Sequence, residues 1–232
     1  MGNIIKKAFF DFIDKTLAQE GQVLDIKRWN SSGMYEVRVA LPHTDMIKWN
    51  AIPRIKVKVA DFEYRDYSPA EWDLTDNSCS LFVEARHTGE GSLWVQQLKA
   101  QQKFVFAPAY TAALPSAEGR VLCVGDGTAL GHFFALKQLT NRKAYAIDSI
   151  VSVEEGTQVP SRITDAHPEA RFIEQNHSGS LTALHRMLAQ LNLKVYSSIY
   201  LAGYIPMVQG LRKILKSDPD VSAKIFANGF WK

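Results

Sequence analysis

Residues 121–131 read VLCVGDGTALG, and this stretch decides the fold of the second half of the chain. Residues 121–124 have the pattern of a buried strand, which runs into a glycine-containing turn and a helical stretch over 128–139. Glycines let a backbone approach a phosphate, and the start of a helix offers free N–H groups and a positive dipole. The G-x-G-x-x-x-G spacing also suits a tight strand-to-helix turn that needs small residues, or a site for S-adenosylmethionine.

Strand and helix signals alternate through the rest of this half. Strands are predicted at 120–124, 144–147, 172–173 and 198–202, and helices at 128–139, 181–191 and 208–215. Such alternation is typical of parallel strands joined by crossover helices. Asp148 follows the second strand, 23 residues after Gly125, close to the spacing at which an acid can hold a ribose hydroxyl. Residues 116–232 are therefore predicted to form a parallel α/β nucleotide-binding domain.

In the first half of the chain, apolar and polar residues alternate with a period of two. Strands are predicted near 23–26 and at 35–41, 54–59, 64–68 and 80–86, with a turn at 30–33. Short strands joined by turns predict an antiparallel β-barrel over residues 20–115. A helix is predicted at 92–100 with Ser92 as its N-cap. Residues 1–19 are predicted to form an amphipathic helix that packs on the body of the protein.

Composition excludes several classes of protein. The 232 residues are 46% hydrophobic and 22% charged, an ordinary globular balance. A net charge of +3 does not require nucleic acid as a partner, although it suits a modest basic pocket for an anion. The two cysteines, Cys79 and Cys123, cannot make a disulfide framework, which favours a reducing compartment.

The sequence also bears on membranes and metals. Charged residues interrupt the apolar ones near the N-terminus, and no apolar run reaches the roughly 20 residues that cross a bilayer. We therefore expect a cytoplasmic protein without membrane insertion. The six histidines show no zinc-like spacing with the cysteines, so we expect no structural metal.

Two further clusters carry candidate chemistry. Residues 65–69 read RDYSP, and on a strand Arg65 and Tyr67 share one face. Arginine can neutralise a phosphate bidentately, and a tyrosine two residues along can lie flat on an aromatic ring. Residues 87–94 read HTGEGSLW, a glycine-containing loop that enters a helix. This loop is a second candidate anion site, or an ordinary capped helix.

In this order, the three motifs resemble the ferredoxin-reductase superfamily, and within it the siderophore-interacting proteins, which are FAD-dependent ferric-siderophore reductases. That family shows R-x-Y-S or R-x-Y-T, then H-G-x-x-G-P-A-S-x-W-A, then G-D-E-T-A-L-P-A, which correspond to residues 65–68, 87–94 and 125–130. The family's A-G-E is similar to Ala202-Gly203-Tyr204, and its closing G-Y-W-R to residues 229–232. The resemblance spans about residues 20–232.

Several positions depart from the family pattern. Gln101 and Gln102 stand where the family has G-D, and Ala107 stands for the glycine of its G-P. Gly127 and Tyr204 replace the acids of G-D-E-T and A-G-E. The motifs that the family uses to bind flavin are better kept than the peripheral ones. The resemblance therefore implies FAD binding more strongly than it implies a particular electron donor or acceptor.

The resemblance implies a role for each matching residue in the barrel. Arg65 would pair with the FAD pyrophosphate, Tyr67 would pack on the isoalloxazine, and Ser68 would lie near flavin N5. Gly91 and Ser92 would bind the pyrophosphate from the helix start, with His87 beside it. Trp94 belongs to the same motif and is predicted to contact the cofactor.

In the second domain, the resemblance places Asp126, Thr128 and Ala129 on the nicotinamide side, with Thr128 nearest the flavin. Ser68 and Thr128 are therefore the predicted catalytic residues. The chain ends in Phe230, Trp231 and Lys232, and two large aromatics are unusual in a frayed tail. Either Trp231 or Phe230 lines the flavin or nicotinamide pocket, or the two cover an apolar patch between the domains.

The implied activity passes electrons from NAD(P)H, or from ferredoxin, through FAD to a ferric siderophore and releases Fe(II). Arg54, Lys56 and Lys58 are candidates to attract an anionic siderophore, although a solvated strand face explains them equally. Two alternatives stay open. One is a flavin or NAD(P)H reductase of the same superfamily with another acceptor, and the other is a nucleotide-binding module without redox activity.

Overall fold

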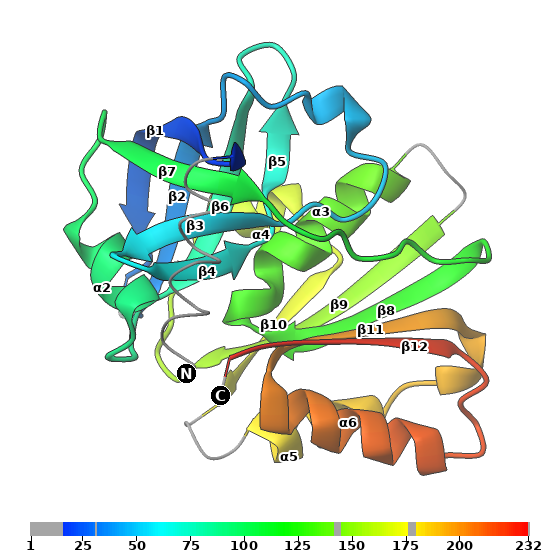
Figure 1. The fold of residues 1–232 in the computed structure, drawn as a ribbon. Helices are drawn as coiled ribbons and strands as arrows, with labels where there is room; N and C mark the ends of the chain where they lie inside the picture. Colours follow the sequence, from blue (N-terminus) through cyan, green and yellow to red (C-terminus); the bar gives the residue numbers. More distant parts are fainter. Residues whose placement is uncertain (1–15, 31, 142–144, 176–179, 232) are drawn as a thin grey trace, which may run out of the picture. The chain divides into compact units, whose positions relative to one another are not determined.

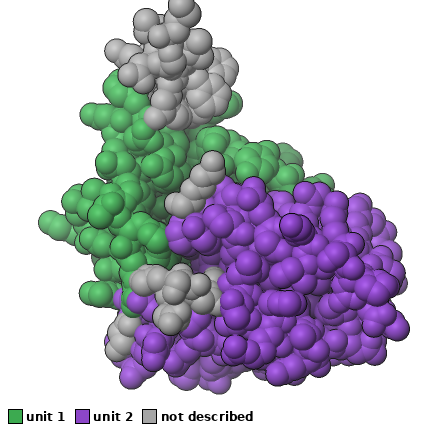
Figure 2. Space-filling model, turned by 90° about the horizontal axis from the view of Figure 1, so that it is seen from below, with its two compact units in different colours: residues 1–28, 33–113 green, residues 29–32, 114–232 purple. Residues whose placement is uncertain are grey.

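The computed structural model describes residues 16–30, 32–141, 145–175 and 180–231, and the chain divides into two compact units (Figures 1 and 2). Unit 1 comprises residues 1–28 and 33–113, and unit 2 comprises residues 29–32 and 114–232. The division at 113/114 lies close to the predicted boundary at 115/116. Of the predicted N-terminal helix, residues 1–15 lie outside the described residues, and Gln19 already belongs to the first strand.

Unit 1 is built on one antiparallel sheet of seven strands in the order β4-β3-β7-β1-β2-β6-β5. Its strands are β1 (Gln19–Arg28), β2 (Met34–Ala40), β3 (Ile55–Ala60), β4 (Glu63–Tyr67), β5 (Ala70–Asp73), β6 (Ser78–Glu84) and β7 (Lys103–Pro108), with a 3-10 turn η1 (Met46–Lys48) after β2. The edge strands β4 and β5 are separated in the chain by Ser68 and Pro69 alone, so the sheet curls until its two edges approach each other. The antiparallel barrel-like fold predicted for this half is confirmed.

The alternating apolar residues of unit 1 fill the inside of the curled sheet. Val37, Val39, Leu81 and Phe106 are buried there, and each comes from a strand with a period of two. The short β5 was not predicted, because its four residues, AEWD, are too few to show that period. The strands predicted at 54–59, 64–68 and 80–86 coincide with β3, β4 and β6 to within two residues.

Helix α2 (Glu90–Gln97) begins two residues before its predicted start. The N-cap is Gly89, whose carbonyl accepts hydrogen bonds from Ser92 N at 2.9 Å and Leu93 N at 3.1 Å. The prediction of Ser92 as the N-cap is therefore wrong. Serine is a strong N-cap residue, but glycine also serves there, and in this loop Gly89 has the extended backbone that a cap requires.

Unit 2 is built on a parallel sheet of five strands in the order β10-β9-β8-β11-β12. Its elements are β8 (Gly119–Asp126), η2 (Gly127–Ala129), α3 (Leu130–Thr140), β9 (Tyr145–Glu154), α4 (Ser161–Ala166), β10 (Ala170–Gln175), α5 (Ser180–Leu188), η3 (Leu193–Val195), β11 (Tyr196–Tyr204), α6 (Ile205–Ser217) and β12 (Lys224–Trp231). Helices α5 and α6 lie together on one side of this sheet, and α3 lies on the other (Figure 1). The predicted parallel α/β fold is confirmed.

The strand order fixes where a ligand site can form in unit 2. The chain moves outward from β8 through β9 to β10 and then returns to place β11 on the other side of β8. In such sheets ligands bind outside the carboxyl ends of the strands, at the point where the order reverses. Here that point lies between the ends of β8 and β11, which are Gly125-Asp126 and Gly203-Tyr204.

The last strand was not predicted from the sequence. Strand β12 pairs in parallel with β11, and this pairing sets Gly229 beside Gly203 and Trp231 beside Tyr204. The aromatic end of the chain is therefore the last part of an edge strand. Within the residues that the structure describes, no helix is long and apolar enough to cross a bilayer.

Candidate functional site

The two motifs of unit 1 come together at Gly91. Gly91 is the second residue of α2, and a Cβ atom built on it would lie 2.9 Å from Tyr67 Oη and 3.3 Å from Arg65 Cγ. Arg65 and Tyr67 alternate along β4 and so point to the same side, as predicted. The start of α2 therefore lies directly on the Arg65–Tyr67 face, at a separation that leaves no room for a side chain.

Trp94 holds Tyr67 in this position. The two rings stack with centroids 5.8 Å apart and planes 28° apart, and Trp94 also packs edge-on against Phe104 in the core of unit 1. Burial raises the pKa of the Tyr67 hydroxyl, although the nearby Arg65 guanidinium opposes the rise. Tyr67 is thus a neutral hydroxyl with one ring face covered by Trp94, a residue that the structure places in the core.

Arg65 is the exposed cation of this cluster. Its Nη1 lies 2.9 Å from Glu63 Oε2 and donates to the Tyr64 carbonyl at 2.8 Å. A guanidinium has five donors, and both of these bonds involve the same nitrogen. Ser68, the next predicted residue, lies partly buried just after the end of β4.

Glu84, at the end of β6, organises the loop that precedes α2. Its Oε1 accepts from Arg86 N at 2.8 Å, and its Oε2 lies 2.8 Å from His87 Nε2. The Glu84 carbonyl also accepts from the buried Ser92 hydroxyl at 3.5 Å. His87 and Ser92 are therefore fixed to one residue, which sequence reasoning did not single out because an acid gives no signal for a phosphate site.

The glycine turn of unit 2 is organised by a different acid, Asp126. This residue is the N-cap of η2, and its Oδ1 accepts from Thr128 N at 2.9 Å and from the Thr128 hydroxyl. Its Oδ2 accepts from Tyr204 N at 2.6 Å, at the end of the neighbouring strand β11. Burial raises the pKa of the Asp126 carboxyl, and hydrogen bonding from Thr128 and Tyr204 opposes the rise.

These bonds change the interpretation of the turn as a phosphate cradle. The N–H groups of Thr128 and Tyr204, which an anion would use, are already bonded to a carboxylate. A Cβ atom on Gly125 would lie 2.2 Å from the Ala202 carbonyl and 2.9 Å from the fully buried Ala129 Cβ. The small residues at Gly125 and Ala129 thus serve a tight strand-to-helix turn, the second of the interpretations that the sequence left open.

The prediction that Asp148 lies at the end of its strand, where it could hold a ribose hydroxyl, is wrong about the strand end. Strand β9 continues to Glu154, and Asp148 lies in its first half, beside Leu122 of β8. Its carboxylate binds Arg120 Nε at 2.8 Å and the Tyr196 hydroxyl at 3.0 Å. Although burial raises the pKa of Asp148, these two partners lower it overall. The residues after Asp148 alternate less clearly, which hid the continuation of the strand.

The C-terminal aromatics pack at the reversal point. The rings of Tyr204 and Trp231 lie with centroids 4.5 Å apart and planes 34° apart. Phe230 packs on the fully buried His132, at 5.8 Å between ring centroids. Within unit 2, therefore, Trp231 lies next to the turn that holds Asp126 and Thr128.

Two of the basic residues proposed to attract an anion have other partners. Arg54 is 5% exposed, and its guanidinium lies over the Tyr110 ring, 4.7 Å from the centroid. Lys56 pairs with Asp66 across the β3–β4 ladder at 2.7 Å. Arg54 is therefore neither a solvated residue nor an exposed anchor for a substrate.

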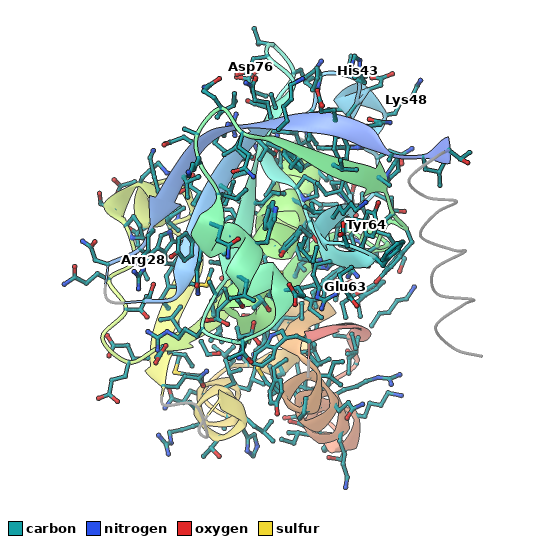
Figure 3. All side chains as sticks on the ribbon, turned by 60° about the vertical axis from the view of Figure 1, so that its left-hand side comes forward. Arg28, His43, Lys48, Glu63, Tyr64 and Asp76 are labelled. Carbon is teal, nitrogen blue, oxygen red and sulfur yellow. The ribbon has the colours of Figure 1, made fainter. Side chains whose placement is uncertain are left out.

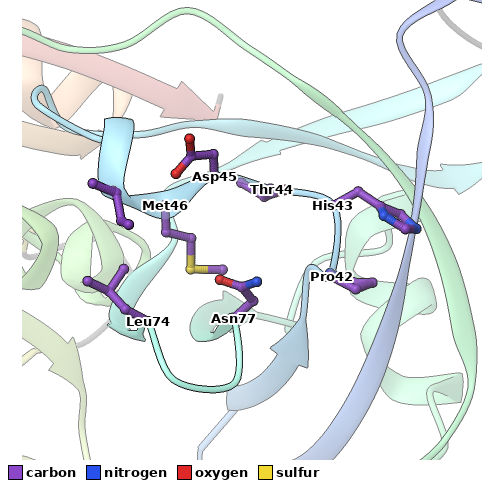
Figure 4. A pocket seen from close by; sticks show the side chains of 8 residues that line it. Pro42, His43, Thr44, Asp45, Met46, Leu74 and Asn77 are labelled. Atoms are coloured by element: carbon purple, nitrogen blue, oxygen red, sulfur yellow. The ribbon is translucent and has the colours of Figure 1, made fainter.

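Unit 1 also has an open hollow of about 400 Å³, lined by Pro42, His43, Thr44, Asp45, Met46, Ile47, Leu74 and Asn77 (Figure 4). None of the predicted site residues lines it. It adjoins the beginning of β6, whereas Glu84 and the α2 loop adjoin the end of that strand. In Figure 3, His43, Lys48 and Asp76 accordingly lie well apart from Glu63 and Tyr64. Within the described part of the chain, no group of three or more His, Cys, Asp or Glu side chains is placed to hold a metal ion.

Comparisons with known proteins agree on the fold. No protein-family model matches the chain. No curated protein matches it either. A siderophore-interacting protein from Acinetobacter baumannii is 15% identical with a TM-score of 0.69, covering 92% of this chain and 89% of that one. The siderophore-interacting protein SipS from Aeromonas hydrophila is 14% identical with a TM-score of 0.68, covering 93% and 91%.

A ferredoxin reductase of carbazole 1,9a-dioxygenase, in its FAD apo form, is 17% identical with a TM-score of 0.72, covering 93% of this chain and 67% of that one. At these identities the likeness is one of fold. The chain has the ferredoxin-reductase-like fold that siderophore-interacting proteins share.

Proposed function

We propose that the chain is a flavin-dependent reductase that binds FAD in unit 1, receives electrons from NAD(P)H or a ferredoxin, and reduces a ferric siderophore. The observation that carries the FAD part is the approach of Gly91 to Arg65 and Tyr67. It brings a cation, an aromatic hydroxyl and the start of a helix to one place, with no side chain between them. The fold of the siderophore-interacting proteins and ferredoxin reductases supports the same proposal.

The residues present fit a dinucleotide flavin. A pyrophosphate needs positive charge and N–H donors. Arg65 supplies the charge, and the N–H groups of Glu90 and Gly91 precede those of Ser92 and Leu93, which donate to the Gly89 carbonyl. The Glu84–His87 pair holds the loop at this helix start. Tyr67 is partly buried and its ring stacks on Trp94, so an aromatic ring is held in place for packing on a planar ligand. When bound, FAD supplies the chemistry that links a two-electron donor to one-electron reduction of Fe(III).

The acceptor has a second candidate. Arg54 and Lys56, two of the three basic residues proposed to attract an anion, are engaged by Tyr110 and Asp66. This engagement favours an acceptor that needs no strong anionic attraction, such as a neutral ferric chelate or free flavin. Comparing the reduction of an anionic ferric catecholate siderophore with that of a neutral ferric hydroxamate, by the flavin-loaded protein, shows whether an anionic or a neutral ferric acceptor is preferred.

A titration of flavin-free protein with FAD tests the central claim. Arg65→Ala is expected to raise the FAD dissociation constant about 10- to 150-fold, because a hydrogen bond to a charged group contributes ~1.5–3 kcal/mol. Lys103→Ala removes another exposed cation from the same sheet, one that pairs with Glu20 at 2.7 Å, and should leave FAD binding unchanged. Absence of saturable FAD binding by the wild-type protein would overturn the proposal.

A further inference from the structure

The carboxylate of Asp126 joins three separate segments of unit 2. It caps η2 through Thr128, and it accepts the Tyr204 N–H at the start of α6. The ring of Tyr204 in turn packs on Trp231, at the end of β12. One side chain thus connects the ends of three strands at the reversal point.

The fit around this carboxylate is tight. Gly203 has a φ of +120°, and a Cβ atom there would lie 2.4 Å from Asp126 Oδ2 and 2.5 Å from its Cγ. The carboxylate therefore lies directly on the backbone of β11. Asp126 is 8% exposed, and its two oxygens accept three bonds from Thr128 and Tyr204.

The same bonds reach the aromatic end of the chain. The Tyr204 N–H that Asp126 accepts fixes the backbone at Tyr204, whose ring packs on Trp231 at 4.5 Å. The β11–β12 ladder is irregular at this point, where the register shifts between Gly203 and Tyr204. Past this shift Trp231 pairs with Tyr204, so the Trp231 ring is tied to Tyr204 and, through the Tyr204 N–H, to Asp126.

We propose that Asp126 is a positioning residue that holds Trp231 against Tyr204 and so builds the aromatic surface on which the donor nucleotide binds. Its carboxylate takes the place of a ligand phosphate at the turn, so the phosphates of the donor bind elsewhere. The positioning follows from the contacts alone, whereas its use for a donor rests on the proposed function.

The near-UV circular dichroism of Trp231 tests the positioning without any cofactor. The difference between wild type and Trp231→Phe isolates the Trp231 band. That band should collapse in Asp126→Asn. The two carboxylate oxygens accept from Thr128 and from Tyr204, whereas an amide has one acceptor oxygen and an NH2 group that only donates. Ser152→Ala is the matched control, since it removes a buried hydrogen bond of 3.2 Å to the Gly125 carbonyl of the same turn. The control should keep the band.

A milder variant covers the case in which Asp126→Asn does not fold. Thr128→Val removes the hydroxyl donor to Asp126 and keeps the N–H, so it should weaken the Trp231 band in the same direction. An unchanged band in Asp126→Asn, or in Thr128→Val where the former is unfolded, would overturn the positioning role.

A kinetic cycle then tests the link to the donor. Reduction of the flavin-loaded protein by NADH should slow about tenfold in both Asp126→Asn and Trp231→Phe, and the double variant should be no slower than the worse single one. Multiplying effects would show that Asp126 acts by another route. If no flavin binds, the proposed function fails, while the dichroism result still decides the positioning.

Discussion

The Gly91→Ala variant is expected to lower FAD affinity much more than it lowers the free energy of unfolding. The added Cβ would lie 2.9 Å from Tyr67 Oη, whereas ordinary contacts begin near 3.4 Å, so one of the two must move by about half an ångström. Tyr67 cannot retreat, because its ring rests on Trp94, which is 9% exposed and packs on Phe104. The start of α2 or the Arg65 side chain must therefore move.

The two effects on folding nearly cancel. Alanine is favoured over glycine inside a helix by up to about 1 kcal/mol, and overpacking a tight contact costs ~1–3 kcal/mol. The free energy of unfolding should therefore fall by no more than about 2 kcal/mol. FAD affinity should fall at least about tenfold, because Arg65 and the helix start must both meet the same pyrophosphate.

Gly89→Ala is the control. A Cβ on Gly89 meets no atom within 4 Å, although the residue is in the same loop, so FAD should bind as in wild type. A small loss of stability is expected, because alanine is a poor N-cap. The assay is a fluorescence titration with FAD, together with urea unfolding of the flavin-free protein. Equal FAD dissociation constants for wild type, Gly89→Ala and Gly91→Ala would refute the placement of the cofactor at this contact.

Three other predictions follow from buried or strained residues. Burial raises the pKa of Glu169, but hydrogen bonds from His167 and Lys137 outweigh burial and lower that pKa to about 2. Wild type should therefore be more stable than Glu169→Gln above pH 4.5, and the difference should fade toward pH 2. Urea unfolding across that range measures it, with ~1–2 kcal/mol expected after solvent screening, and a difference that grows on acidification contradicts it. Cys79 is fully buried and its pKa is raised to about 12, so at pH 8 the folded protein should not react with a thiol reagent until it is unfolded in urea. Gln101 has a φ of +68°, so Gln101→Gly should raise the free energy of unfolding by about 0.5–1 kcal/mol, and a loss of stability would show that this backbone is unstrained.

The sequence predicts elements whose signal is local and misses those that depend on partners. Residues 121–131 show a strand, a turn and a helix, because burial, glycine spacing and helical period all act within that stretch. Strand β12 gives no such signal, since its residues are half-exposed and it forms by pairing with β11. The site shows the same division. The side shared by Arg65 and Tyr67 follows from strand periodicity, whereas the part played by Glu84 depends on a loop whose course no pattern reveals.

Asp126 shows why the place of a motif can be predicted from the sequence while its hydrogen bonds cannot. The glycine turn does end β8 at the reversal point of the sheet, where a ligand is expected. Its chemistry, however, depends on whether the N–H groups are free, and that is decided by Tyr204, 78 residues further along the chain. The sequence shows an acid inside a glycine turn but cannot show that its carboxylate caps two segments.

At two departures from the family pattern, Gln101 and Tyr204, the backbone N–H makes a hydrogen bond that does not depend on the side chain. Gln101 replaces a glycine yet keeps a left-handed backbone, and its N–H donates to the Val23 carbonyl at 2.7 Å. Tyr204 replaces an acid, and its contribution to the turn is again an N–H, the one that Asp126 accepts. Such positions tolerate new side chains because the bond does not involve them. At Gly91 and Gly203 the absence of a side chain is itself required, so substitutions there would alter the sites that these departures leave intact.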